Sequence, residues 1–170
     1  DYASTILLMQ PAGEDGTQAI YDASSMRLPM KTNNATLSGT LKKFDRCVVF
    51  NGTDSEILLY PGAAFKLMGD FTIEAWVLHS GGSNSYQTII ASGVETFTTN
   101  SVFLMIIGAT KKVSAGYNGS PSVVTSTTVL ATNTWYHVAL TRSGSTVCLF
   151  IDGVLESTAN SSVPWDFSDS

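Results

Sequence analysis

The chain has few charges and no long apolar run. Charged residues make up 14% of its 170 residues, against about 25% in a typical soluble protein. The net charge is −5, and the nine basic residues are scattered except for the pairs Lys42–Lys43 and Lys111–Lys112. Nucleic-acid binding needs a basic face, so we expect no nucleic-acid partner. The longest apolar run, Val102–Ile107, is far shorter than the ~18 residues of a membrane span, so we expect no membrane insertion.

Cysteine is also scarce. Cys47 and Cys148 are the only two, too few for a disulfide scaffold. Both lie in predicted strands, where they form either one bridge or two buried free thiols, the commoner arrangement for such a pair. The chain opens with Asp1 rather than Met, which predicts that it is processed or part of a longer polypeptide.

Serine, threonine and glycine supply much of the polarity, which suits exposed β-sheet and turns. Short apolar segments recur about every 8–12 residues between turn-forming residues, a pattern typical of an all-β sandwich. The predicted strands are Ser4–Gln10, Ala35–Leu41, Cys47–Phe50, Glu56–Tyr60, Phe71–Leu78, Gln87–Ser92, Val102–Gly108, Lys112–Tyr117, Val123–Leu130, Trp135–Thr141, Thr146–Ile151 and Val154–Thr158.

Three segments have other signals. Glu14–Met30 is predicted as a loop. Asn51-Gly52 predicts a hairpin joining the strands on either side of it, although the connection is longer than the ideal two residues. Ala63–Met68 is the only segment for which we expect a helical turn.

Alternation assigns faces to the predicted strands. In Trp135–Thr141, Tyr136, Val138 and Leu140 share one face, and the intervening residues share the other. In Phe71–Leu78, the odd-numbered positions are all apolar, whereas the even-numbered positions are mixed. A mixed second face indicates a central strand that is partly covered or that lines a concave surface.

Several of these segments resemble one family. Phe71–Val77 (FTIEAWV), Trp135–Gly144 (WYHVALTRSG) and Leu149–Gly153 (LFIDG) are close to motifs of the laminin-G-like branch of the concanavalin-A-like lectin/glucanase superfamily. Ile6–Met9, Asp22–Ser25 and Cys47–Gly52 are similar to its earlier motifs. The resemblance implies an antiparallel β-sandwich with a concanavalin-A-like jelly-roll arrangement, formed by a single domain over residues 1–170.

The resemblance fails near the end of the chain. Family domains usually continue with closing strands, whereas this sequence ends at Val163–Ser170. In the family, the closing strand usually lies beside the first strand. We therefore expect Ile6–Met9 to pair with a strand outside this sequence, supplied by more of the same polypeptide or by a neighbouring subunit.

The opening ILLMQPAGEDGT together with SGSTVCLFIDGVLE is similar to domains of tailed-bacteriophage structural proteins and of bacterial adhesins. This likeness implies a non-catalytic structural or adhesion domain of a virion fibre, spike or decoration protein, assembled with other copies or other virion proteins. The alternative is a carbohydrate-binding lectin module of a secreted or cell-surface protein. The expected location is accordingly the virion, or the cell exterior.

Catalysis is not expected. The superfamily's glucanases use an E-x-D-x-E strand whose two catalytic carboxylates lie about 5–5.5 Å apart in retaining enzymes. No such motif occurs here, Glu74 is the only acid on its strand, and Asp152 lies in a predicted turn. The histidines, His79 and His137, are far apart in the sequence.

Some members of the family hold a structural calcium ion. The matching positions here are Asp22, Asn51 and Asp54. Calcium prefers six to eight oxygen ligands with several carboxylates, and Asn51 replaces one carboxylate. Turn formation alone also explains Asp22 and Asn51, so a structural calcium ion and a purely structural turn remain two alternatives.

A carbohydrate site needs an exposed aromatic ring beside polar groups. The candidates are Tyr86, Tyr117, Asn118 and, if its face is open, Trp76. The competing interpretation places Trp76 and Trp135 in the core or in a second layer against it, where large rings are common. We expect His137 to bond a neighbouring residue, and Trp165 to anchor the C-terminal segment on the domain or on another subunit.

Overall fold

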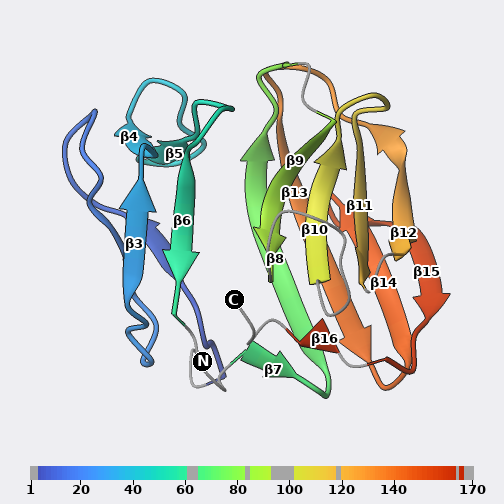
Figure 1. Ribbon diagram of the computed structural model, residues 1–170. Helices are drawn as coiled ribbons and strands as arrows, with labels where there is room; N and C mark the ends of the chain where they lie inside the picture. The colour runs from blue at the N-terminus through green and yellow to red at the C-terminus, as the bar shows by residue number, and fades with distance from the viewer. Residues whose placement is uncertain are drawn as a thin grey trace. The chain divides into compact units, whose positions relative to one another are not determined.

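A computed structural model describes residues 4–60, 65–82, 85–92, 102–117, 120–163 and 165–166. The chain divides into two compact units, residues 1–64 and 65–170, and each is described by itself (Figure 1). The regular elements of the described residues are short β-strands, and none of these residues belongs to a helix that is long and apolar enough to cross a membrane. That the whole chain acts as a single domain stays a prediction.

Unit 1 (residues 1–64) consists of three antiparallel strand pairs, β1 with β2, β3 with β6, and β4 with β5. Its most buried apolar side chains are Ile20, Ala35, Leu37 and Cys47. The strands are β1 (Met9–Pro11), β2 (Ile20–Asp22), β3 (Met30–Asn33), β4 (Thr36–Ser38), β5 (Cys47–Val49) and β6 (Glu56–Leu59).

Two predictions for unit 1 are wrong. The predicted loop Glu14–Met30 contains β2, and β5 and β6 do not form a hairpin with each other. The reason for the second lies in Asn51, whose side-chain oxygen accepts the backbone N–H groups of Thr53, Asp54 and Ser55 at 2.8, 3.1 and 3.2 Å. The connection is thus folded around this side chain, and the two strands pair with β4 and β3 instead.

The predicted first strand, Ser4–Gln10, is also shorter in the structure. It is reduced to β1, where Met9 pairs with Asp22. Just before it, the Leu8 N–H donates to the Asp22 side chain at 2.9 Å rather than to a neighbouring strand. Pairing of Ile6–Met9 with a strand outside this sequence stays a prediction.

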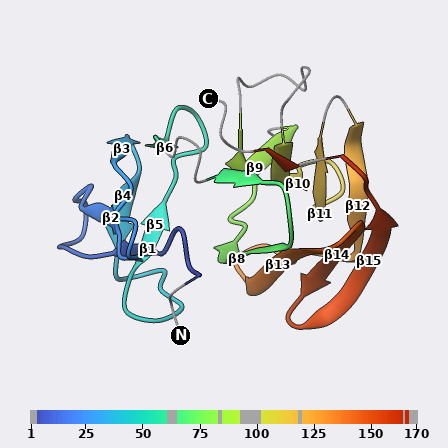
Figure 2. The same ribbon diagram turned by 90° about the horizontal axis from the view of Figure 1, so that it is seen from below.

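Unit 2 (residues 65–170) contains a β-sandwich, which confirms the predicted fold class. Its two four-stranded antiparallel sheets have the orders β12-β11-β10-β9 and β15-β14-β13-β8, and Figure 2 shows them as two facing layers. The strands are β8 (Phe71–Leu78), β9 (Tyr86–Ala91), β10 (Val102–Ile107), β11 (Lys112–Tyr117), β12 (Ser120–Val129), β13 (Trp135–Ser143), β14 (Thr146–Ile151) and β15 (Val154–Asn160).

A third, two-stranded sheet of unit 2 pairs β7 (Lys66–Leu67) with β16 (Trp165–Asp166). Of the predicted helical turn Ala63–Met68, the first two residues lie outside the described part of the chain, Phe65 has a 3-10 helical conformation, and Lys66–Leu67 form a strand instead. The indole of Trp165 is fully buried, lies 6.0 Å from the ring of Phe71, and donates its N–H to Ser161 Oγ at 3.3 Å. Trp165 therefore anchors the C-terminal segment on unit 2, one of the two predicted alternatives.

The core of the sandwich follows the two-residue alternation of its strands. On β13 and β14, four inward side chains are completely buried, namely Val138, Leu140, Val147 and Leu149. Leu140 lies opposite Leu149 in the antiparallel register. The predicted assignment of faces is therefore confirmed, and most predicted strands after Phe71 are found within a few residues of their expected bounds. The central position predicted for Phe71–Leu78 is wrong, because among the described strands β8 forms the edge of its sheet, beside β13.

Both cysteines are free thiols, Cys47 buried and Cys148 half-buried. Of the two predicted alternatives, the structure thus has the free thiols rather than the bridge.

A single carboxylate joins the outer edges of the two sheets of unit 2. Glu156 on β15 accepts the backbone N–H groups of Thr127 and Thr128 on β12 at 2.7 and 2.8 Å. It also accepts hydrogen bonds from the hydroxyl groups of both threonines, that of Thr128 at 2.7 Å. These hydrogen bonds, those of the Thr127 and Thr128 side chains foremost, lower the pKa of Glu156 to about 2.

The core pattern predicts a large difference between two leucines of the same sheet. Leu149→Ala should lower the free energy of unfolding by about 2–5 kcal/mol, because it leaves a cavity among buried neighbours. Leu155→Ala, at a side chain that is 54% exposed, should change it by less than about 0.5 kcal/mol. Urea unfolding of both variants tests this, and equal effects would contradict the proposed core.

The Glu156 bonds predict a loss of stability in acid. Because the pKa of Glu156 is lower in the folded chain, its contribution is fully present above the unfolded pKa of about 4.3. It is lost as the pH falls through the folded value of about 2. Glu156→Gln should destabilise the chain at neutral pH by about 1 kcal/mol, allowing for solvent screening. Denaturant unfolding should show the gap between variant and wild type closing as the pH falls from 5 toward 2, and a constant gap would contradict the assignment.

Candidate functional site

The outward face of the β8–β13 strand pair carries an aromatic and charged group of side chains. The antiparallel register places Trp76 directly opposite His137, and Glu74 opposite Ala139. These side chains share the outer face because the neighbouring positions, such as Ala75 and Val138, point into the sandwich. We refer to Trp76, His137 and Glu74 together as the outer-face group.

The three side chains of the outer-face group are in contact. The rings of Trp76 and His137 lie with centroids 5.2 Å apart and planes tilted by 53°. Nε2 of His137 lies 3.4 Å from Oε2 of Glu74, which agrees with the expectation that His137 bonds a neighbour. The contact joins adjacent strands of a sheet, so the group has a defined geometry.

The turn after β14 holds the backbone of His137 in place. The Asp152 carboxylate accepts the His137 N–H at 2.8 Å, and the Asp152 N–H donates to the His137 carbonyl at 2.8 Å. Asp152 and Gly153 both have positive φ, 49° and 79°, as a tight type I′ turn requires. The predicted turn residue Asp152 thus braces the outer-face group.

The interpretation of Trp76 as a core residue is wrong. Its side chain is 38% exposed, because the odd-numbered positions of β8, not the even-numbered ones, face the sandwich interior. Trp135 lies on the same outward face but is half-buried. By contrast, the side chains of β10 in the other sheet are buried along most of the strand, on both faces.

The other predicted carbohydrate residues do not join Trp76. Tyr86 is 44% exposed but lies on β9, in the opposite sheet. Tyr117, at the end of β11, directs its ring edge-on to Trp165, with centroids 5.5 Å apart. Asn118 lies outside the described residues. Of the predicted set, only Trp76 therefore belongs to the outer-face group.

Glu74 and His137 are not among the binding residues predicted from the sequence, although the alternation of their strands already indicates which way they face. Alternation puts Glu74 and Trp76 on one face of β8, and His137 on the outward face of β13. The missing information was the register between the two strands. Without it, no pairing of Trp76 with His137 can be derived.

The outer-face group suits a ligand with an apolar face and several hydroxyl groups. An exposed indole offers a flat apolar platform. A carboxylate accepts hydrogen bonds from hydroxyl groups, and an imidazole both donates and accepts them. The side chain of Glu74 is 62% exposed and that of His137 is 27% exposed, so solvent, and hence a ligand, reaches both.

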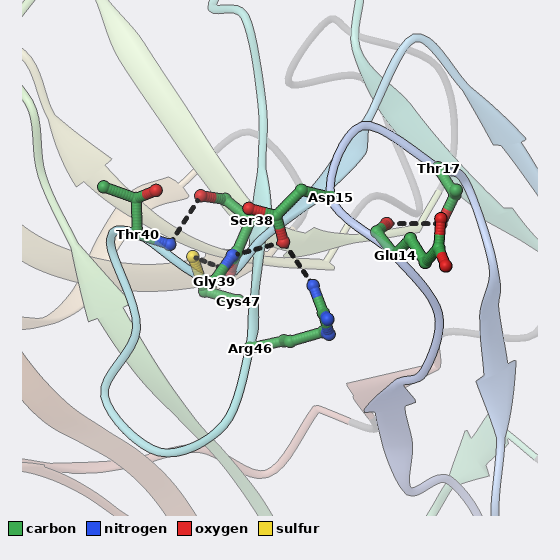
Figure 3. Close-up of polar contacts among 8 residues, drawn as sticks. All are labelled: Glu14, Asp15, Thr17, Ser38, Gly39, Thr40, Arg46 and Cys47. Carbon is green, nitrogen blue, oxygen red and sulfur yellow. Dashed lines mark hydrogen bonds and ion pairs between the residues drawn. The ribbon is translucent and has the colours of Figure 1, made fainter.

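The Cys47 thiol does not have the setting of a catalytic nucleophile. Cys47, shown in Figure 3, is buried and lies 3.6 Å from the Ser38 carbonyl, to which its thiol donates. Burial, and then the negative charge of Asp15, raise the pKa of the Cys47 thiol, whereas a nucleophile needs a lowered one. Asp15 instead pins a loop, since its carboxylate accepts the Gly39 N–H at 2.8 Å and forms an ion pair with Arg46.

Asp22, one of the predicted calcium ligands, is buried and engaged in four hydrogen bonds. Its carboxylate accepts the N–H groups of Leu8, Ser24 and Leu28 and the Ser24 hydroxyl, at 2.8–2.9 Å. Burial raises the pKa of Asp22, but the four hydrogen bonds together lower it by more than burial raises it. The net pKa of Asp22 therefore lies below its ordinary value. The carboxylate organises the turn after β2.

Asn51 and Asp54, the other two predicted ligands, are likewise engaged. The Asn51 side-chain amide donates to one oxygen of Asp54 at 2.6 Å, and the Asn34 amide donates to the other at 2.8 Å. In the part of the chain that the structure describes, no three His, Cys, Asp or Glu side chains are grouped so as to hold a metal ion. Hydrogen bonding accounts for every side-chain oxygen of the predicted set, and calcium binding stays a prediction.

Comparison with known families identifies one match. The family model described as the concanavalin A-like lectin/glucanases superfamily matches residues 51–170, a range that begins before β6 and includes both sheets of the sandwich. No curated protein sequence matches the chain.

Two solved structures resemble this chain to different degrees. The binding domain of botulinum neurotoxin serotype D is similar with a TM-score of 0.64 and 15% identity, over 86% of this chain and 38% of that one. The carbohydrate binding module CBM66 from Bacillus subtilis matches with a TM-score of 0.49 and 20% identity, over 79% of this chain and 81% of that one. At these identities the comparisons concern the fold alone, and this chain spans only 38% of the length of the toxin domain.

The role of Asp22 predicts a strong structural effect. Asp22→Ala should lower the free energy of unfolding by about 2–4 kcal/mol, because it leaves several donors without an acceptor. Asp54→Ala, at an exposed loop, should cost less than about 1 kcal/mol. Thermal unfolding of both variants tests this. A rise in the wild-type Tm on adding CaCl2 that Asp22→Ala abolishes would contradict the purely structural role and support calcium.

Proposed function

We propose that this chain, which belongs to the concanavalin A-like lectin/glucanases superfamily, is a non-catalytic glycan-binding module that uses the outward face of β8 and β13. The observation that carries the proposal is the exposure of Trp76 beside His137 and Glu74. Lectins and glucanases both recognise carbohydrates, so the superfamily is consistent with a glycan ligand.

The roles of the three side chains follow from their chemistry. The indole of Trp76 stacks on the CH face of a sugar ring, because this removes apolar surface of both from water. Glu74 accepts hydrogen bonds from sugar hydroxyl groups, and His137, held by the Asp152 turn, supplies a second polar contact. A sheet face is flat and open, so we expect it to bind the middle of a glycan chain rather than to enclose a terminal sugar.

We propose that the module does not catalyse glycan hydrolysis, and this proposal is based on the sequence. The two-carboxylate strand of the superfamily's glucanases is missing, and Glu74 is the only acid on β8. A retaining glycosidase needs a second carboxylate about 5–5.5 Å from the first. Binding without turnover is therefore the proposed activity.

A glycan-binding module of this kind works outside the cell, on a secreted or surface-attached protein. The placement that the sequence favours, on a virion in a fibre, spike or decoration protein assembled with other copies, becomes our second proposal, and it is based on the likeness of the sequence to phage structural domains. Both placements use the same binding face. They differ in the protein that displays it.

If the outer-face group binds glycans, removal of the Trp76 ring should lower glycan affinity without unfolding the chain. Trp76→Ala should weaken binding to a recognised glycan at least tenfold, which corresponds to about 1.4 kcal/mol, while Tm changes little because the side chain lies at the surface. The glycan is first found by screening the wild-type chain on a glycan array, and affinities are then measured by calorimetry.

Val129→Ala is the matched control. Val129 is 56% exposed and lies on β12, in the other sheet, so its removal should leave glycan affinity unchanged. Glu74→Gln should weaken binding less than Trp76→Ala does. Unchanged affinity of a folded Trp76→Ala variant would overturn the proposed site, and no binding of the wild type to any glycan would overturn the proposed function.

A further inference from the structure

Unit 1 contains an open pocket whose lining includes none of the residues of the outer-face group. Its volume is about 420 Å³, within the 300–1,000 Å³ range of pockets that hold small ligands. The pocket combines apolar side chains with one aromatic ring and one cation. Its lining residues are Ile20, Tyr21, Asp22, Arg27, Leu28 and Met30.

The cation of the pocket sits on a strained backbone position. Arg27 has a φ of 47°, in the left-handed region that is unfavourable for a non-glycine residue. The turn around it is held from inside, because the Asp22 carboxylate binds the N–H groups of Ser24 and Leu28, and the Arg27 N–H donates to the Ser24 carbonyl at 3.3 Å. The buried carboxylate thus keeps Arg27 at the pocket.

Within the described residues, the Arg27 guanidinium has no hydrogen-bond or ion-pair partner. Asp22, the acidic residue of the pocket, is 6% exposed and is occupied by its own four donors. It therefore does not pair with Arg27. Arg27 is also an exposed residue, so a ligand in the pocket can reach it.

We propose that this pocket binds a sugar that carries a carboxylate, with Arg27 holding the carboxylate and the ring of Tyr21 packing on the sugar. A guanidinium matches a carboxylate through two parallel hydrogen bonds. Tyr21 is 48% exposed, and Ile20, Leu28 and Met30 supply apolar surface beside it. A sugar acid presents this combination of a planar anion and an apolar ring face.

The charge balance of the pocket favours a carboxylate over a phosphate. Arg27 supplies one positive charge, and the ionised Asp22 lies in the same wall. A phosphate group near neutral pH carries up to two negative charges and is repelled more strongly by Asp22 than a carboxylate with one. Among the described residues that line this pocket there is no second cation, which phosphate sites commonly have.

The site in unit 1 does not depend on the outer-face group, although both are proposed to bind carbohydrate. The test therefore uses the whole chain with Trp76 intact. The probe is an oligosaccharide with a terminal glucuronic acid, compared with the same oligosaccharide ending in glucose. We expect backbone amide shifts of Tyr21, Arg27 and Leu28 in two-dimensional NMR, and at least tenfold weaker binding of the neutral sugar.

Two variants of Arg27 separate binding from folding. Arg27→Gln should weaken binding of the acidic sugar at least tenfold. Arg27→Gly should abolish this binding at an unchanged or higher Tm, because glycine adopts the left-handed φ without strain. Lys31→Gln, on β3 outside the pocket, removes the same charge and should leave affinity unchanged.

Several results would overturn the proposal. Equal affinity for the acidic and neutral sugars, unchanged binding by Arg27→Gln, or tighter binding of inorganic phosphate would each do so. Loss of binding in Lys31→Gln as well would show that only net charge matters, which also contradicts a specific site. Loss of acidic-sugar binding in Trp76→Ala but not in Arg27→Gln would assign the sugar to the outer-face group instead.

Discussion

Burial of the apolar side chains at the centre of unit 2 is the constraint on which the other features of this unit depend. Val138, Leu140, Val147 and Leu149 are fully buried, and each stands on a strand whose side chains alternate between two faces. Burial of one face consequently directs every second residue outward. A shift of the register by one residue would bury the charged positions and expose the apolar ones, so packing of the core also fixes the outer surface.

The outer-face group is a product of that register. Trp76 and His137 come from segments separated by some sixty residues of sequence, yet the antiparallel pairing of β8 with β13 brings their rings to 5.2 Å. Glu74 reaches His137 from the same strand as Trp76. Because all three side chains stand on paired strands rather than on loops, their spacing is set by the sheet, which favours a preorganised binding surface.

Unit 1 is organised differently, by side chains that replace backbone partners. Short strands leave many N–H groups without a ladder, and Asp22 and Asn51 accept several of these groups each. The same short polar residues that suggest calcium ligands in the sequence thus hold turns in the structure. One consequence is that Arg27 is kept in a left-handed conformation beside the pocket of unit 1.

The strands of unit 2, their faces and the fold class follow from the sequence, because alternation and turn residues act locally; Phe71–Leu78 and Thr146–Ile151 form strands over the predicted bounds. Strand pairing does not follow in the same way. The Asn51-Gly52 signal predicts a hairpin that does not form, since which strands pair depends on contacts distant in the sequence. For the same reason, exposure of Trp76, its contact with His137 and the pocket around Arg27 belong to the tertiary structure: register and burial arise only when distant segments pack together.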